Sequence, residues 1–300
     1  MVKKPLISVV MITYNHENYI REAMEGVLMQ ECNFEIELIV ANDCSTDNTN
    51  NIIQDIIQQH RNASWIKYTN HTKNKGMMPN FIWAMQQCQG KYIALCEGDD
   101  YWIDPLKLQK QVDFLEANPD YTICFHKVKI LQGNTFMEGD ATEKTYSRIK
   151  SEKVSQRDLI LHGNFMHTPS VVFRNVIKEF PFEFSKSVVG DYFLHIMVSE
   201  KGYIKRLEDR MCVYRTGVGI FSSKTKLEMY ESALITYGCL LSYLKDEGLK
   251  KIALSNFIII LENHNSIFKS NMINSKVARL KSFKDLLKIF IYKLKYLFLK

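Results

Sequence analysis

Short apolar runs alternate with helical patterns over the first third of the chain. The first run is rich in β-branched residues and apolar on both faces, which is typical of a central strand in a parallel sheet. Four such runs occur, at residues 7–13, 36–41, 65–69 and 92–96. Helical patterns follow the first three runs. This alternation predicts a parallel sheet with right-handed crossovers, flanked by helices.

Capping residues refine the expected helices. Ser45 or Thr46 can cap the second helix, which continues to about residue 59, and Asp47 is favourable near its positive end. Pro79 fits the first turn of the third helix, and Gly90 is expected just past its end.

Polar side chains follow three of the predicted strands. The clusters are Thr13-Tyr14-Asn15, Asn42-Asp43 and the acidic segment at residues 97–100. Ligands of open α/β sheets bind beyond the carboxyl ends of the strands. The three clusters are therefore expected to open onto one crevice.

The acidic segment carries Glu97, Asp99 and Asp100 around a single glycine. Three carboxylates so close together repel one another and raise each other's pKa, whereas a divalent cation with its preference for hard oxygen ligands converts the repulsion into coordination. The segment is interpreted as a metal-holding, phosphate-facing turn. The alternative is a solvated acidic turn that caps the helix after Pro105.

Glycine-rich phosphate loops are missing from this sequence. No Gly-x-Gly-x-x-Gly follows the first strand, and no Gly-x-x-x-x-Gly-Lys-Ser/Thr occurs. A nucleotide would then need side chains for its base and ribose and a metal for its phosphates. Asp43 can accept from a base N–H or a ribose hydroxyl, and Tyr14 offers an aromatic ring.

The order and spacing of these motifs resemble family 2 glycosyltransferases, the inverting GT-A type. Residues 5–130 are similar to the nucleotide-binding half of that family. Later segments resemble the acceptor-side elements of bacterial members that build cell-surface polysaccharides; they are residues 164–174, Gly190-Asp191, Tyr214-Arg215 and Gly217-Val218-Gly219. The resemblance implies a GT-A (nucleotide-diphospho-sugar transferase) fold, with a mostly parallel central sheet and a helical C-terminal extension.

Carried over residue by residue, the resemblance implies a donor site. Thr13, Tyr14, Asn15 and Asp43 would hold the nucleoside with Glu17 nearby, and the loop from Lys73 to Gly76 would approach the base or diphosphate; the metal, Mn²⁺ or Mg²⁺, would be bound by Asp99, Glu97 and Asp100. Glu97 stands where the family usually has the first Asp of Asp-x-Asp, and Cys44 stands where a glycine is common.

Asp191 would be the general base that takes the proton of the acceptor hydroxyl during inverting transfer. The alternative is an N-terminal cap of the helix that ends near Lys201. Arg215 can fork onto diphosphate oxygens, with a surface salt bridge as the rival. His167 has two interpretations as well: it contacts acceptor or diphosphate, or it is a buried histidine satisfied by backbone.

Composition sets broader limits. With 300 residues and 46% hydrophobic content the chain can bury a large core. The expected organisation is a catalytic domain over residues 1–220, divided into a nucleotide-binding half (1–130) and an acceptor half (131–220), followed by a helical extension (221–300). Helical patterns at 224–246 and 249–268 are expected to pack beside the sheet or against a second subunit, as in a homodimer.

The formal charge of +6 is concentrated at the C-terminus. Residues 276–300 hold eight Lys/Arg against Asp285, a surplus of seven, so the remainder sums to −1. Such a balanced body argues against nucleic-acid binding. Apolar residues recur at helical spacing in this tail, which is typical of a basic amphipathic helix at a membrane surface; a helix docked on protein is the alternative.

No signal peptide and no run of about 18 apolar residues is seen, so a cytoplasmic protein peripheral to the inner face of the membrane is expected. The overall prediction is a metal-assisted glycosyltransferase that moves a sugar from a nucleotide-sugar donor, most often a UDP-sugar in this family, to a hydroxyl of a glycan or lipid-linked acceptor. A nucleotidyltransferase and a non-catalytic sugar-nucleotide-binding scaffold are the alternatives.

Overall fold

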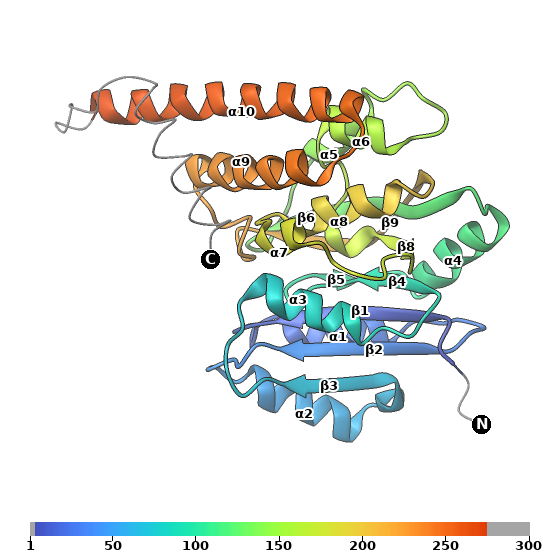
Figure 1. Ribbon diagram of the computed structural model, residues 1–300. Helices are drawn as coiled ribbons and strands as arrows, with labels where there is room; N and C mark the ends of the chain where they lie inside the picture. Colours follow the sequence, from blue (N-terminus) through green and yellow to red (C-terminus); the bar gives the residue numbers. More distant parts are fainter. Residues whose placement is uncertain (1–3, 275–300) are drawn as a thin grey trace. The chain divides into compact units, whose positions relative to one another are not determined.

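The computed structural model describes residues 4–274. Four parallel strands, in the order β3-β2-β1-β4, form one end of the sheet (Figure 1). They are β1 (Ile7–Thr13), β2 (Ile36–Asn42), β3 (Ile66–Asn70) and β4 (Tyr92–Leu95). All four strands predicted from the apolar runs are confirmed. Side chains on both faces of β1, β2 and β4 are buried, as expected of central strands.

The rest of the sheet mixes directions. Beyond β4 the order continues β8-β6-β9-β5, and β7 pairs with β6. The pair β6 and β9 is parallel, whereas β8 runs antiparallel to both β4 and β6. The bounds are β5 (Tyr101–Trp102), β6 (Tyr121–Gln132), β7 (Thr135–Phe136), β8 (Val172–Arg174) and β9 (Tyr203–Thr216).

Helices connect the parallel strands as predicted. The crossovers are α1 (Ile20–Leu28), α2 (Thr49–Gln59) and α3 (Met77–Gln86), and α4 (Lys107–Ala117) follows β5. Helix α3 packs on β1 and β2, whereas α1 packs against α2 and β5. A short helix, η1 (Ala63–Trp65), precedes β3, and α5 (Ala141–Tyr146), α6 (Gln156–His162) and η2 (Thr168–Ser170) lie between β7 and β8.

Two of the predicted helix ends were wrong. Helix α2 begins at Thr49 with Asn48 as its N-cap, so neither Ser45 nor Thr46 caps it. The carboxylate of Asp47 does accept from the Thr49 N–H at 3.0 Å, close to the positive end. Helix α3 ends at Gln86, and Gly90 instead precedes β4, where an added Cβ would approach the Ser8 nitrogen at 2.6 Å.

A buried carboxylate closes the amino ends of the parallel strands. Glu37, only 3% exposed, accepts hydrogen bonds from the Ser8 hydroxyl at 2.5 Å and from the Gln89 N–H at 2.7 Å. Its second oxygen pairs with the half-exposed Lys67. Both oxygens of this buried carboxylate are therefore satisfied within the sheet.

The chain divides into two compact units. One unit combines the chain up to Glu179 with His195–Gly219 and contains the sheet, and the other combines Phe180–Leu194 with the chain from Ile220 onward. The second unit holds α7 (Phe182–Lys186), α9 (Lys226–Tyr243) and α10 (Glu247–Asn274), and α8 (Gly190–Ser199) begins in it.

Helices α9 and α10 pack against each other, which confirms the predicted helical pair. None of the helices among the described residues has the length and apolar character needed to cross a membrane. The basic tail at 276–300 lies outside the described residues.

Candidate metal and nucleotide site

An acidic turn, residues 97–100, follows β4 directly. The Gly98 N–H donates to the Ile12 carbonyl of β1 at 3.0 Å. A Cβ on Gly98 would lie 2.7 Å from the Thr13 hydroxyl and 2.8 Å from Nδ1 of His16. Glycine is therefore needed for the turn to approach the end of β1 this closely.

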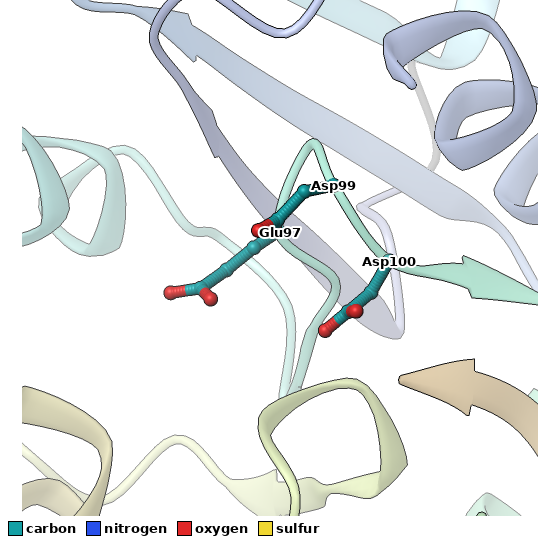
Figure 2. Close-up of side chains that lie close together, drawn as sticks. All are labelled: Glu97, Asp99 and Asp100. Atoms are coloured by element: carbon teal, nitrogen blue, oxygen red, sulfur yellow. The ribbon is translucent and has the colours of Figure 1, made fainter. Parts of the chain in front are cut away.

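Three carboxylates gather on this turn. Glu97, Asp99 and Asp100 can each offer one oxygen, and these oxygens lie within 4.8 Å of one another (Figure 2). Asp99 and Asp100 are buried, and Glu97 is half-buried. The structure brings together the three residues that the sequence predicted as metal ligands.

Asp100 has the surroundings of a cation ligand. Its Oδ1 accepts from the Arg215 N–H at 2.7 Å, whereas its buried Oδ2 has no hydrogen-bond partner. Burial, reinforced by the negative charge of Asp99, raises the pKa of Asp100 well above its ordinary value. An orphaned oxygen among carboxylates is costly unless a cation binds it, and Mn²⁺ or Mg²⁺ prefers such hard oxygen donors. The residues present therefore fit a divalent metal ion.

Arg215, on β9, binds the acidic turn. Its Nη1 donates to the Asp99 carbonyl at 2.6 Å, and its Nη2 pairs with Glu22 of α1. The guanidinium carbon lies 4.5 Å from the ring centroid of Tyr101 and 5.1 Å from that of Tyr19. The role predicted for Arg215, contact with a diphosphate, stays a prediction.

Hydrogen bonds join the loops that follow β1 and β2. Asn15, in the left-handed region at φ 56°, donates its N–H to the Ser45 hydroxyl at 2.9 Å, and its side-chain oxygen accepts from the Thr46 N–H at 2.8 Å. The Glu17 carboxylate accepts from the Asn48 N–H at 2.9 Å. Asn15 and Glu17 thus shape the loop that carries the 41%-exposed Tyr14 ring.

Asp43 lies where β2 ends and holds a second loop. Its two carboxylate oxygens accept from the Lys75 N–H at 2.7 Å and the Gly76 N–H at 2.9 Å. Its own N–H donates to the Thr13 carbonyl at 2.9 Å. Lys73 of the same loop is exposed. Asp43, Thr13 and the loop around Gly76, which the sequence assigned to one nucleotide site, are neighbours.

His16 was not singled out by the sequence reading. Its Nδ1 lies 3.2 Å from the Thr13 hydroxyl. Burial lowers the pKa of His16, while the negative charges of Asp99 and Asp47 oppose that shift. The signal available was its place in the polar cluster after the first strand.

His167 has a carboxylate partner, which neither sequence interpretation included. Its Nε2 lies 3.1 Å from both oxygens of Asp140, the N-cap of α5. Its ring centroid lies 4.4 Å from that of Tyr214 on β9. His167 and Asp140 line a small cavity together with Phe125, Phe165 and Arg206 among others.

Asp191 belongs to the other unit, in the first turn of α8. Its Oδ1 accepts from the Tyr192 N–H at 2.7 Å. Its assignment as general base stays a prediction, as does the division of the chain at residues 130 and 220.

Comparison with known proteins decides the family. The model of Glycosyl transferase family 2 matches residues 8–180, more than half of the chain. This chain belongs to that family. The match covers the parallel strands and the acidic turn, and the fold is of the GT-A type. The resemblance found in the motifs is thereby confirmed.

Two relatives in sequence extend this comparison. The chain is 36% identical over 211 residues to the uncharacterized protein Rv1520 of Mycobacterium tuberculosis, covering 70% of this chain and 58% of that protein's length. It is 35% identical over 112 residues to the putative teichuronic acid biosynthesis glycosyltransferase TuaG of Bacillus subtilis, covering 37% of this chain and 42% of TuaG.

A solved structure shares the fold. The mannosyltransferase PcManGT of Pyrobaculum calidifontis, in complex with GDP-Man and Mn²⁺, has a TM-score of 0.60 at 14% identity and covers 100% of this chain and 87% of its own. At this identity the likeness concerns the fold alone.

Proposed function

We propose that this protein is a metal-dependent, inverting glycosyltransferase. It moves a sugar from a nucleotide-sugar donor to a hydroxyl of a glycan or lipid-linked acceptor, in the assembly of a cell-surface polysaccharide. The observation that carries the proposal is the acidic turn, whose three carboxylates converge beyond β4 with one buried oxygen of Asp100 left without a partner. Family membership and the name of TuaG support the reaction class and the polysaccharide.

The nucleotide binds at the ends of β1 and β2. Tyr14 is exposed and offers its ring to the base, and Asp43 and Thr13 lie together at the strand ends. The 73–76 loop, held by Asp43, lies against the base or diphosphate. A UDP-sugar is the first donor to test, and the GDP-Man bound to PcManGT makes GDP-sugars the second.

The acidic turn holds the divalent metal ion. Asp99 is the direct ligand, with Glu97 and Asp100 beside it. A bound Mn²⁺ or Mg²⁺ would stabilise the negative charge that develops on the departing diphosphate. Asp99, Glu97 and Asp100 would hold this ion beyond the end of β4.

Asp191 is proposed as the general base. Inverting transfer needs a carboxylate that removes the proton of the acceptor hydroxyl while its oxygen attacks the anomeric carbon opposite the leaving group. Replacing Asp191 by Asn keeps the shape and removes the base. We expect Asp191→Asn to bind the donor as the wild type does and to lose transfer. Full transfer by this variant would remove Asp191 from the mechanism.

The C-terminal segment is proposed to attach the enzyme to a membrane surface. Residues 276–300 carry eight Lys/Arg against one acidic residue, a charge balance that favours anionic lipid headgroups. Deletion of these residues is expected to abolish co-sedimentation with anionic liposomes, while neutral liposomes serve as the control. Unchanged co-sedimentation of the deleted protein would discard the attachment.

A nucleotide-sugar panel tests the function. The purified protein is incubated with UDP- and GDP-sugars, and in parallel with nucleoside triphosphates and a sugar phosphate. Each incubation contains Mn²⁺, with and without a chelator, and the released product is identified. A glycosyltransferase releases a nucleoside diphosphate in the presence of Mn²⁺ and stops with the chelator. Release of pyrophosphate from a nucleoside triphosphate would instead identify a nucleotidyltransferase, and donor binding without turnover would identify a scaffold.

A further inference from the structure

We propose that Arg215 is the positioning residue of the acidic turn, and that the turn presents its carboxylates to a cation only while Arg215 holds it. The inference rests on the proposed cation site. It concerns a residue that lies on β9, far along the chain from the carboxylates it would arrange.

Arg215 binds the turn at two successive residues. Its Nη1 donates to the backbone carbonyl of Asp99 at 2.6 Å, and its main-chain N–H donates to Oδ1 of Asp100 at 2.7 Å. The first bond fixes the peptide between the two aspartates, and the second fixes the rotation of the Asp100 carboxylate. The side chain of Arg215 therefore holds the peptide that joins the two aspartates, and its main chain holds the Asp100 carboxylate.

The second bond also decides which Asp100 oxygen remains available. Because Oδ1 accepts from Arg215, the other oxygen is the one left buried without a hydrogen-bond partner. Asp100 Oδ2 is therefore the atom with an unfilled requirement for a positive partner.

The guanidinium itself contacts two aromatic rings and a carboxylate. It lies over the ring of Tyr101, which opens β5, and near the ring of Tyr19, and its Nη2 pairs with Glu22. Arg215 is only 8% exposed, and β5 pairs with β9 two residues away, at Tyr101 and Val213. A planar fork is required here, because a lysine ammonium cannot bind the Asp99 carbonyl and Glu22 in the same geometry.

Electrostatics and positioning predict opposite results for removal of this side chain. Removing a positive charge beside three carboxylates strengthens the attraction of the site for a cation. Removing the side chain keeps the main-chain bond to Asp100 and loses the Nη1 bond that holds the Asp99 carbonyl. Cation binding then weakens, because outer residues that orient metal ligands typically contribute about tenfold or more to affinity. The sign of the change therefore separates the two roles.

A matched control exists in the same unit. Arg174 on β8 also uses its guanidinium to bind backbone carbonyls, those of Tyr121 at 2.8 Å and Leu115 at 2.5 Å, and the Tyr92 hydroxyl at 3.0 Å. Those partners lie on elements other than the acidic turn. Loss of Arg174 should therefore cost stability without a change in the turn.

The experiment measures Mn²⁺ affinity by calorimetry on the full chain without nucleotide, well below each variant's melting temperature. Arg215→Met and the milder Arg215→Lys are compared with Arg174→Met and Arg174→Lys. We expect both Arg215 variants to bind Mn²⁺ about tenfold more weakly or worse, and both Arg174 variants to keep the wild-type affinity.

Equal or tighter Mn²⁺ binding by the Arg215 variants would overturn the inference, as would an equal loss in the Arg174 variants. Wild-type protein that binds no Mn²⁺ would overturn the cation site and this inference with it. Wild-type protein that binds Mn²⁺ and loses it on Arg215 substitution, yet transfers no sugar, would leave the inference standing and contradict only the proposed function.

Discussion

The two ends of the parallel strands each bury a carboxylate, and the two carboxylates are treated differently. At the amino end, Glu37 is satisfied by Ser8, Gln89 and Lys67. At the carboxyl end, Asp100 keeps one oxygen without a partner beside the carboxylate of Asp99. A carboxylate whose two oxygens both have partners contributes to the fold, whereas one with an oxygen that lacks a hydrogen-bond partner can bind a ligand. The difference distinguishes structural from functional acids within one sheet.

Removal of Asp99 should have the largest effect on activity. Asp99→Ala is expected to lower metal-dependent transfer by about a thousandfold, since charge stabilisation at the leaving group is lost. Its thermal stability should stay near that of the wild type, because a buried charge facing like charges is removed. The measurement is the transfer rate at saturating Mn²⁺, beside a melting curve. Activity near wild type would place the metal elsewhere.

Removal of Glu37 should have the next largest effect, and it should appear in stability alone. Glu37→Ala leaves the buried Ser8 hydroxyl and the Gln89 N–H without their acceptor, so we expect the free energy of unfolding to fall by about 3 kcal/mol. Urea denaturation at neutral pH measures the change. Glu37→Gln, which can keep the bonds to Oε1, should lose less. A fall in Mn²⁺ affinity in either variant would contradict the purely structural role of Glu37.

The smallest effect is the pH dependence of the metal-free protein. Burial and the charge of Asp99 raise the pKa of Asp100, so between its unfolded and folded values the native state holds a proton that the unfolded chain has lost. Stability contributed by this proton is present at low pH and is lost as pH rises through the folded pKa.

Asp100→Asn removes this titration. Without metal, the variant should therefore gain stability over the wild type as pH is raised from about 4 towards neutrality. Melting temperatures across this range, with chelator present, measure the difference. A constant difference at every pH would mean that Asp100 does not titrate as described. Added Mn²⁺ should stabilise the wild type more than the variant.

The elements of the sheet were predictable because their signals are local. Apolar runs define β1 and β2, and the acidic turn follows a strand without a spacer. Adjacency of Thr13 and Asp43 followed from parallel topology, since carboxyl ends of neighbouring strands share an edge. The place of the 73–76 loop beside them came from the family resemblance.

The partners that decide the chemistry were not predictable, because they are distant in sequence. Arg215 reaches Asp100 across 115 residues, and Ser8 reaches Glu37 across 29. The N-cap at Asn48 was missed for a local reason, since several polar residues in a row can each begin a helix.

The most direct test of the central claim is a crystal of the full chain grown with Mn²⁺ and UDP, with anomalous scattering recorded at the manganese edge. The account predicts one anomalous peak, from a manganese ion that Asp99 coordinates. A nucleotide should lie in the same crevice, beside Asp43. A peak away from the acidic turn, or a nucleotide bound in a separate pocket from Asp99, would contradict it.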